Sequence, residues 1–320
     1  MFLHEVKNIL EGAKMDYCDI GSAMLAYKLY GNGNTTLVVE TCLGGCSAEW
    51  WHIAEQLSDE YRVLLYDRAG IGESSTSTLD RTAKNIASEL DKLIDLLEIK
   101  DCIMIGHSQG GLYAMEYACL HQDKVKGVVL LDPALTPFDN IYREKLTTKE
   151  AKKCYIGNTS IYKTQIFISS LGLYRFLTPM MKKASPLADH KYSEEAVEYM
   201  LKAFCNKKTH KTILNEYISN HTDTYTKEIE ERFNKSVLRN MPVKLVTRSR
   251  DVMIEYVKKH KVDEQTAIRF EDISQELLKK YLSLSYNSEQ IVAQNSNHFI
   301  HLTNFKAFKN AIDGINAVIK

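Results

Sequence analysis

Residues 101–118 read DCIMIGHSQGGLYAMEYA, and this stretch decides what kind of fold the chain can have. The apolar run 102–105 predicts a buried strand, and the residues from Gly111 onwards predict a helix. Between them, glycines flank Ser108 on both sides in the pattern Gly-x-Ser-x-Gly. A serine hydroxyl reacts only where it protrudes and where a base accepts its proton, and a sharp strand–turn–helix with small neighbours exposes it in this way. The pattern therefore predicts Ser108 as a nucleophile.

Short apolar runs rich in Val, Ile and Leu alternate along the chain with longer segments of helical period, among them 86–97. This alternation indicates a mostly parallel sheet covered by helices, because parallel strands are buried on both faces and need helical crossovers. The predicted fold class is therefore α/β, with a doubly wound central sheet. The runs that we predict as strands are 36–40, 62–66, 102–105, 125–131, 243–247 and 290–293.

Near the N-terminus, Asn32-Gly33 lies between two strand-like runs and predicts a hairpin turn rather than a phosphate-binding loop. We therefore expect the sheet to be antiparallel at its start and parallel afterwards.

The strand pattern breaks in the middle of the chain. From about Phe138 to Arg239 there are only helix-compatible segments with many Lys, Tyr and Glu, and strand character returns at 241–246. This predicts an α/β core formed by residues 1–136 and 241–320, with a helical cap inserted as residues 137–240. The cap is expected over the carboxyl ends of the strands, the edge at which open α/β sheets bind ligands.

Composition limits the classes of partner. Lys and Arg together number 41, as do Asp and Glu, so the chain has no global field to attract nucleic acid or an anionic membrane surface. Seven scattered cysteines without a CxxC pair favour reduced thiols and argue against a zinc site. No window approaches the ~18 apolar residues of a membrane span, so the expected location is the cytoplasm.

Four segments resemble successive signature segments of the α/β-hydrolase superfamily, within its capped branch. They are ETCLGG at 40–45, YDRAGIGES at 66–74, GHSQGG at 106–111 and VVLLDP at 128–133. The resemblance covers about residues 25–133 and again 243–302, and it does not extend over the predicted cap. One departure is Cys42, where many relatives have glycine. The resemblance implies a serine hydrolase that needs no cofactor.

The family's chain order of Ser, then Asp or Glu, then His implies the other catalytic residues. His298 follows the last predicted strand and is the expected base, with His301 as its competitor. Asp251 follows the strand 243–247 and is the expected acid, whereas Asp132, at the end of the strand 125–131, is the alternative. The long gap between Asp251 and His298 predicts an additional helical excursion at about 253–272.

The oxyanion of an acyl-transfer intermediate needs two N–H donors. The resemblance assigns them to the backbone of Leu43, in the loop after the strand 36–40, and of Gln109, which follows the nucleophile. His298 and His301 lack a carboxylate or a third histidine nearby in sequence, so no metal site is expected.

These features predict a carboxylesterase-like hydrolase that cleaves an ester or related acyl bond of a small molecule through an acyl-enzyme. The enzymatic alternatives are an aminopeptidase of the proline-releasing kind and a lactonase. The first would need acidic cap residues to bind a free amine, whereas this cap holds more Lys and Arg than Asp and Glu. A ligand-binding receptor or scaffold with the same fold is the alternative outside the enzymes. The sequence indicates neither the acyl group nor the oligomeric state.

Overall fold

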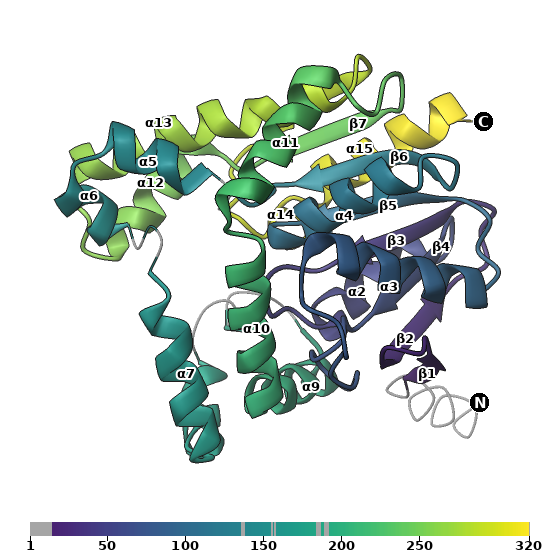
Figure 1. Ribbon diagram of the computed structural model, residues 1–320, viewed down its shortest axis with the longest axis horizontal. Coiled ribbons are helices and arrows are strands. Elements are labelled where there is room, and N and C mark those ends of the chain that lie inside the picture. Colours follow the sequence, from purple (N-terminus) through teal and green to yellow (C-terminus); the bar gives the residue numbers. More distant parts are fainter. Residues whose placement is uncertain are drawn as a thin grey trace.

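The computed structural model describes residues 15–135, 138–154, 156, 158–183, 187–188 and 192–319. Its described residues contain an eight-stranded sheet in the order β1-β2-β4-β3-β5-β6-β7-β8 (Figure 1). β1 and β2 run antiparallel to their neighbours, and every pairing from β4 to β8 is parallel. The strands are β1 (Asp16–Asp19), β2 (Met24–Tyr30), β3 (Thr36–Glu40), β4 (Arg62–Tyr66), β5 (Cys102–His107), β6 (Val125–Leu131), β7 (Val243–Thr247) and β8 (Ser288–Val292).

The predicted α/β class and the six predicted strands are confirmed, with differences at three ends. β5 continues to His107 because Gly106 and His107 still pair with β6. β8 begins at Ser288, two residues before the predicted run, because polar residues are tolerated on an edge strand that is only partly buried, and it ends at Val292, one residue before the predicted end.

The prediction of a hairpin at Asn32-Gly33 is wrong. β2 pairs with β1 and β4, so the loop 31–35 crosses to a strand that is not its neighbour in the sheet. The backbone of Gly33 instead lies against Glu60 and Tyr61, where an added Cβ would come within 2.2 Å of the Glu60 carbonyl oxygen. Close backbone approach, rather than a tight turn, explains this glycine.

Helices cover both faces of the sheet, as expected for alternating strands and helices. One face packs under α3 (Ala83–Leu96), α4 (Gln109–Leu120) and α11 (Asp223–Lys235), and the other under α2 (Trp51–Leu57) and α15 (Phe305–Ile319). Successive strand residues alternate between these two cores: Met104 belongs to the first and Ile105 to the second. Short elements complete this part of the chain: η1 (Ser47–Trp50), η3 (Lys280–Leu284) and α14 (Ile300–Thr303).

Two helical insertions extend from the carboxyl ends of the strands. Between β6 and β7 the described residues form α5 (Asp139–Lys145), α6 (Thr148–Lys153), α7 (Ser160–Ser170), α8 (Tyr174–Met181), α9 (Glu194–Phe204), α10 (Lys207–Ser219) and α11. Between β7 and β8 lie α12 (Arg250–Lys259) and α13 (Glu264–Lys279), in agreement with the predicted excursion. How these segments divide into a core and a cap domain stays a prediction.

The two insertions meet. Figure 1 shows α5 and α6 beside α12 and α13, and the contacts between them are specific. Tyr142 of α5 stacks on Phe270 of α13 with 5.2 Å between ring centroids, and its hydroxyl lies 2.7 Å from Ser274 Oγ. At the rim, Lys145 pairs with Glu276 at 2.6 Å. The first part of the long insertion is thus packed against the short one.

Candidate active site

Ser108 occupies a strained turn between β5 and α4. Its backbone has φ 54° and ψ −121°, a conformation that a residue with a Cβ rarely adopts. Hydrogen bonds hold it on both sides: its N–H donates to the Leu131 carbonyl at 3.0 Å, and its own carbonyl accepts from Ala134 N–H at 2.8 Å. The surrounding strand and helix therefore maintain the strain, as a nucleophile on a sharp elbow requires.

The glycines around Ser108 are required by contact as well as by the turn. A Cβ at Gly106 would lie 2.5 Å from the Gly110 carbonyl oxygen, and a Cβ at Gly110 would lie 2.2 Å from the Glu40 carbonyl oxygen. At Gly111 a Cβ would reach 2.7 Å from Pro133 Cβ. Only glycine lets the start of α4 approach β3 and the loop after β6 so closely.

The structure brings His298 to Asp132. His298 lies in the loop between β8 and α14, and its Nδ1 is 2.5 Å from Oδ2 of Asp132, directly after β6. Asp132 is fully buried and has φ 43°, so it leaves its strand through a left-handed turn that points its carboxylate toward His298. Burial by itself would raise the pKa of Asp132, but Arg248 and His298 lower it to about 2.

The expected contact between Asp251 and His298 is not made. Asp251 lies in the first turn of α12, its side chain is 91% exposed, and its carboxylate faces Arg250 at 3.5 Å. The residue that points inward from the end of β7 is Arg248. The candidate acid is therefore corrected to Asp132, the alternative that the sequence offered.

Arg248 links the candidate acid to the short insertion. Its Nη1 donates to Asp132 Oδ2 at 2.8 Å, and its Nη2 and Nε donate to the two oxygens of Glu271 on α13 at 2.7 and 3.2 Å. All three side chains are buried, so one cation offsets two carboxylates away from water. Sequence reasoning missed this group, although Glu271 carries a signal because it shares a buried helix face with Ala267 and Ser274.

The other two histidines near Ser108 have packing roles. His107 is fully buried, its Nε2 donates to the His298 carbonyl at 2.9 Å, and burial lowers its pKa to about 3. His301 is buried in α14 and stacks on Trp50 with ring centroids 4.0 Å apart. His107 thus supports the loop that carries His298, and the position of His301 favours His298 as the base.

Leu43, the expected oxyanion donor, lies in a loop whose carbonyls are fixed by Arg68. The guanidinium of Arg68, buried after β4, donates to the carbonyls of Thr41 and Cys42 at 2.9 and 2.8 Å. It also pairs with Glu40 at 3.3 Å and with Glu216 of α10 at 3.2 Å. Sequence reasoning missed the contribution of α10, a helix of the long insertion, to this cluster.

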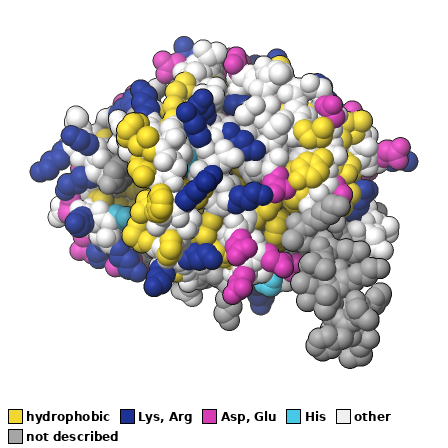
Figure 2. All heavy atoms as spheres, turned by 90° about the horizontal axis from the view of Figure 1, so that it is seen from below, with side chains coloured by type: hydrophobic (Ala, Val, Ile, Leu, Met, Phe, Trp, Pro, Cys, Tyr) yellow, Lys and Arg dark blue, Asp and Glu magenta, His cyan; other side chains and the backbone are white. Residues whose placement is uncertain are grey.

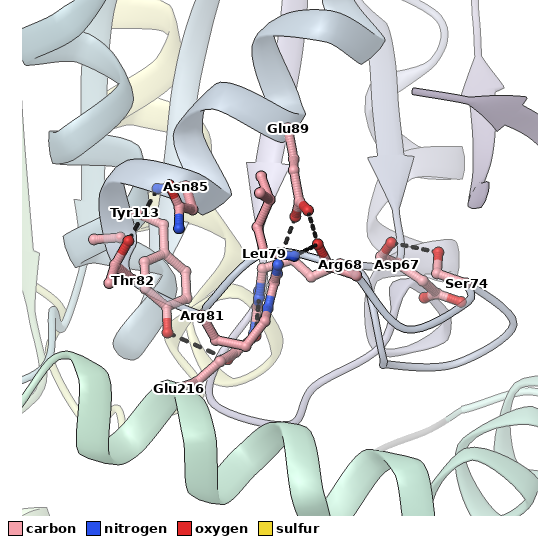
Figure 3. A network of polar contacts seen from close by, with 12 residues as sticks. Asp67, Arg68, Ser74, Leu79, Arg81, Thr82, Asn85, Glu89, Tyr113 and Glu216 are labelled. Carbon is pink, nitrogen blue, oxygen red and sulfur yellow. Dashed lines mark hydrogen bonds and ion pairs between the residues drawn. The ribbon is translucent and has the colours of Figure 1, made fainter. Parts of the chain in front are cut away.

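Figure 3 shows how Glu216 reaches the core from α10. Besides Arg68, its carboxylate lies 3.9 Å from Arg81 and accepts a hydrogen bond from Tyr113 at 3.2 Å. Tyr113 belongs to α4, the helix that begins with Gln109, the second expected oxyanion donor. The buried carboxylate of Glu216 therefore connects α10 to both sides of the expected oxyanion site.

A cavity of about 450 Å³ opens beside Ser108, Asp132 and His298. Its remaining walls come from the loop after β6, from both inserted helical segments and from the loop before α14. They are mainly apolar or aromatic and consist of Pro133, Ala134, Leu135, Tyr142, Arg248, Met253, Tyr256, Phe270, Ser274, Asn297 and Phe299. Among the described residues, no cluster of three or more His, Cys, Asp or Glu side chains could hold a metal ion.

Comparison with known proteins gives relatives of varied description. A protein of Bacillus subtilis, YqjL, is 36% identical over 106 residues, which are 33% of this chain and 42% of that protein. Karrikin insensitive 2 receptor B of Petunia hybrida is 30% identical over 121 residues, which are 36% of this chain and 44% of the receptor. The aligned part thus spans less than half the length of these two relatives.

Structural similarity extends further along the chain. The solved structure of the N-formylmaleamic acid deformylase Nfo from Pseudomonas putida superposes with a TM-score of 0.61 at 18% identity, over 93% of this chain and all of that one. The family model described as alpha/beta hydrolase fold matches residues 35–153, from β3 to α6. Together with the sheet order and the serine elbow, this match shows that the chain has the α/β-hydrolase fold.

Proposed function

We propose that this protein is a serine hydrolase that cleaves an ester or related acyl bond of a small molecule through an acyl-enzyme. The observation that carries the proposal is the joint geometry of three residues. Ser108 has a strained elbow conformation, His298 Nδ1 lies 2.5 Å from Asp132, and all three residues line one cavity. A protein that only packs or binds has no need of this combination.

In the proposed reaction the Ser108 hydroxyl attacks the carbonyl carbon while His298 accepts its proton through Nε2. Asp132 faces Nδ1, so it holds the imidazole in the tautomer that leaves Nε2 free to act as a base. The N–H groups of Leu43 and Gln109 stabilise the oxyanion. His298 then gives the proton to the leaving alcohol, and a water molecule, activated in the same way, releases the acid from Ser108.

The charge state of the buried groups suits these roles at neutral pH. Asp132 stays ionised because Arg248 and His298 hold its pKa at about 2 against the effect of burial. His107 stays neutral, since burial lowers its pKa to about 3. An ionised acid beside the base and a neutral histidine behind it favour proton transfer through His298 alone.

The cavity supports a neutral substrate with a compact apolar group. Arg248 is the cation in its wall, but this guanidinium is already paired with Asp132 and Glu271. An anionic substrate would therefore find no uncompensated positive charge among the described residues that line the cavity. Met253, Phe270 and Phe299 instead offer apolar contact to a small acyl or aryl group.

The side chains at the site distinguish the proposed ester hydrolysis from the alternative enzyme activities. A haloalkane dehalogenase would need an aspartate in place of Ser108. An aminopeptidase would need a carboxylate that faces a free amine, whereas Asp132, the acidic residue among those that line this cavity, is engaged with His298 and Arg248. A lactone is an ester, so lactone hydrolysis belongs to the proposed reaction class.

The test is labelling with a fluorophosphonate probe, followed by p-nitrophenyl esters of increasing acyl length. We expect the wild-type protein to be labelled at Ser108 and to hydrolyse short esters, and we expect Ser108→Ala to lose on the order of 10⁶ in kcat. A receptor that has lost turnover would bind small esters without releasing p-nitrophenol. That outcome, or full activity in Ser108→Ala, would overturn the proposal.

A further inference from the structure

Helices α7 and α8 expose apolar side chains that helices of a globular protein normally bury. Phe176 is 81% exposed, and Phe167 and Met180 are each 65% exposed. We call this region the α7–α8 surface and define it by its exposed apolar residues: Ile161, Phe167, Leu171, Leu173, Phe176, Leu177 and Met180. Contiguous apolar surface of this kind marks an interaction site rather than ordinary surface variation.

The charged residues of the same segment are all basic. From Asn158 to Lys183 the sequence contains no Asp or Glu, and the chain's neutral net charge hides this local excess. Its cations are Lys163, Arg175, Lys182 and Lys183. Figure 2, a view from the end of the molecule where α7 and α10 lie, shows dark blue Lys and Arg side chains between yellow hydrophobic ones.

A hollow beside the apolar residues adds two further cations, Lys202 and Lys207, to Arg175. It encloses about 640 Å³ between α7, α8 and the junction of α9 with α10, and its walls include Arg175, Lys202 and Lys207. Lys202 also pairs with Glu73 at 2.9 Å. The hollow is large enough for a phosphate headgroup and is lined by cations, next to side chains that would contact acyl chains.

We propose that the α7–α8 surface docks the protein on the surface of a bilayer that contains anionic phospholipids. Exposed Phe, Leu and Met side chains would enter the headgroup–acyl boundary, and the surrounding Lys and Arg would contact lipid phosphates, the combination by which amphipathic helices bind membrane surfaces. The proposed attachment is peripheral: these side chains would reach only the boundary between headgroups and acyl chains. The described part of the chain includes no helix with the length and apolar character of a membrane span.

The positive charge of the α7–α8 surface also argues against the other candidate partner, a second copy of this chain. A symmetric dimer would place one basic α7–α8 surface against another, and like charges across an interface oppose association. An anionic lipid surface has the opposite sign. Docking there is independent of the proposed hydrolysis, because the α7–α8 residues do not line the cavity at Ser108.

The experiment is flotation of the 320-residue protein with phosphatidylcholine vesicles that contain or lack 30 mol% phosphatidylglycerol. We expect binding to the anionic vesicles, little binding to the neutral ones, and release as salt is raised, because salt screens the contacts with phosphate. Equal binding to both vesicle types, or none to either, would overturn the proposal.

Two variants separate the contributions. An apolar triple variant removes apolar contacts and consists of Phe167→Gln/Phe176→Gln/Met180→Gln. A basic quadruple variant removes charge and consists of Lys163→Gln/Arg175→Gln/Lys182→Gln/Lys183→Gln. Each variant should bind anionic vesicles about tenfold or more weakly than the wild type. The matched control Leu96→Gln/Val318→Gln changes side chains that are 58% and 64% exposed elsewhere, and it should bind as the wild type does. Hydrolysis of a soluble ester should be the same in all four proteins.

Sedimentation velocity without vesicles tests the second copy directly. We expect a monomer at micromolar concentration in the wild type and in the apolar triple variant. A wild-type dimer that the triple variant dissociates, together with absent vesicle binding, would assign the α7–α8 surface to self-association and overturn the membrane proposal.

Discussion

At Asp132 a single carboxylate oxygen, Oδ2, receives both His298 at 2.5 Å and Arg248 at 2.8 Å. The residue combines full burial with a left-handed backbone, so its orientation is determined by the turn after β6. The family resemblance favoured Asp251. Both aspartates follow predicted strands, so strand position alone did not distinguish them. Which of them turns inward depends on local backbone geometry, and the apolar pattern of the strands does not encode that geometry.

Asp132→Asn should therefore lower kcat for p-nitrophenyl butyrate by roughly 10⁴, because the amide stabilises the wrong tautomer of His298. Asp251→Asn is the matched control, and its kcat should stay close to wild type, since its side chain is 91% exposed and 3.5 Å from Arg250. Both variants should be compared at equal folded concentration. The reverse ranking would return the acid to Asp251.

His107 should make stability depend on pH. Its pKa falls from 6.5 to about 3 in the folded protein because burial disfavours the charged imidazole. Between these values the unfolded chain binds the proton and the folded protein does not, so the free energy of unfolding decreases as pH falls, by about 1.4 kcal/mol per pH unit from this group. This contribution is fully present above pH 6.5.

The variant His107→Gln removes the titration, and its side-chain amide can replace Nε2 as donor to the His298 carbonyl. Urea denaturation between pH 6 and pH 4.5 should show a shallower loss of stability in His107→Gln than in the wild type. Equal slopes for the two proteins would mean that folding does not lower the pKa of His107.

At the scale of elements, the apolar runs predicted β3, β4, β6 and β7 to the residue, because parallel strands buried on both faces are continuously apolar. The same reasoning placed the serine elbow and the helical excursion. It failed to predict which elements contact each other. It paired β2 with β3, which are not neighbours in the sheet. It also could not show that α13 supplies Glu271 to Arg248 or that α10 supplies Glu216 to Arg68. These contacts join residues 23 and 148 positions apart, and no local pattern records them.

The Arg248–Glu271 pair makes α13 a support for the candidate acid. Arg248→Met should lower the free energy of unfolding by about 3–5 kcal/mol, because Glu271 and Asp132 would then be buried without their cation. Arg248→Met/Glu271→Leu should recover part of this loss, since it removes one of the uncompensated carboxylates. Both are measured by urea denaturation at pH 7.

Arg250→Met is the control for this pair. Arg250 contacts Asp251 and Asp272 at the surface, where ion pairs contribute about 0–1 kcal/mol, so the variant should unfold nearly as the wild type does. A double variant less stable than Arg248→Met would show that Glu271 stabilises the fold by some means other than its pairing with Arg248.

At the scale of the whole molecule, the cavity at Ser108 is built from segments far apart in the sequence. The loop after β6, α5, α12, α13 and the loop before α14 all contribute side chains to it. The predicted cap, residues 137–240, contributes Tyr142 of α5, but none of the described lining residues belongs to α7, α8, α9 or α10. Specificity for the acyl group should therefore depend on the short insertion and on α5.

Phe270→Ala tests whether the short insertion determines specificity for the acyl group. Phe270 lines the cavity and stacks on Tyr142, so its removal lengthens the apolar space next to Ser108. We expect kcat/KM to shift toward longer p-nitrophenyl esters, by about tenfold in the ratio of octanoate to butyrate, which is within the range that one or two buried methylene groups contribute. The matched control is Phe176→Ala on α8, a residue that is 81% exposed and does not line the cavity; its ratio should equal that of the wild type. A shift in Phe176→Ala and none in Phe270→Ala would mean that the acyl chain lies under the long insertion, and that the pocket formed by α13 has another use.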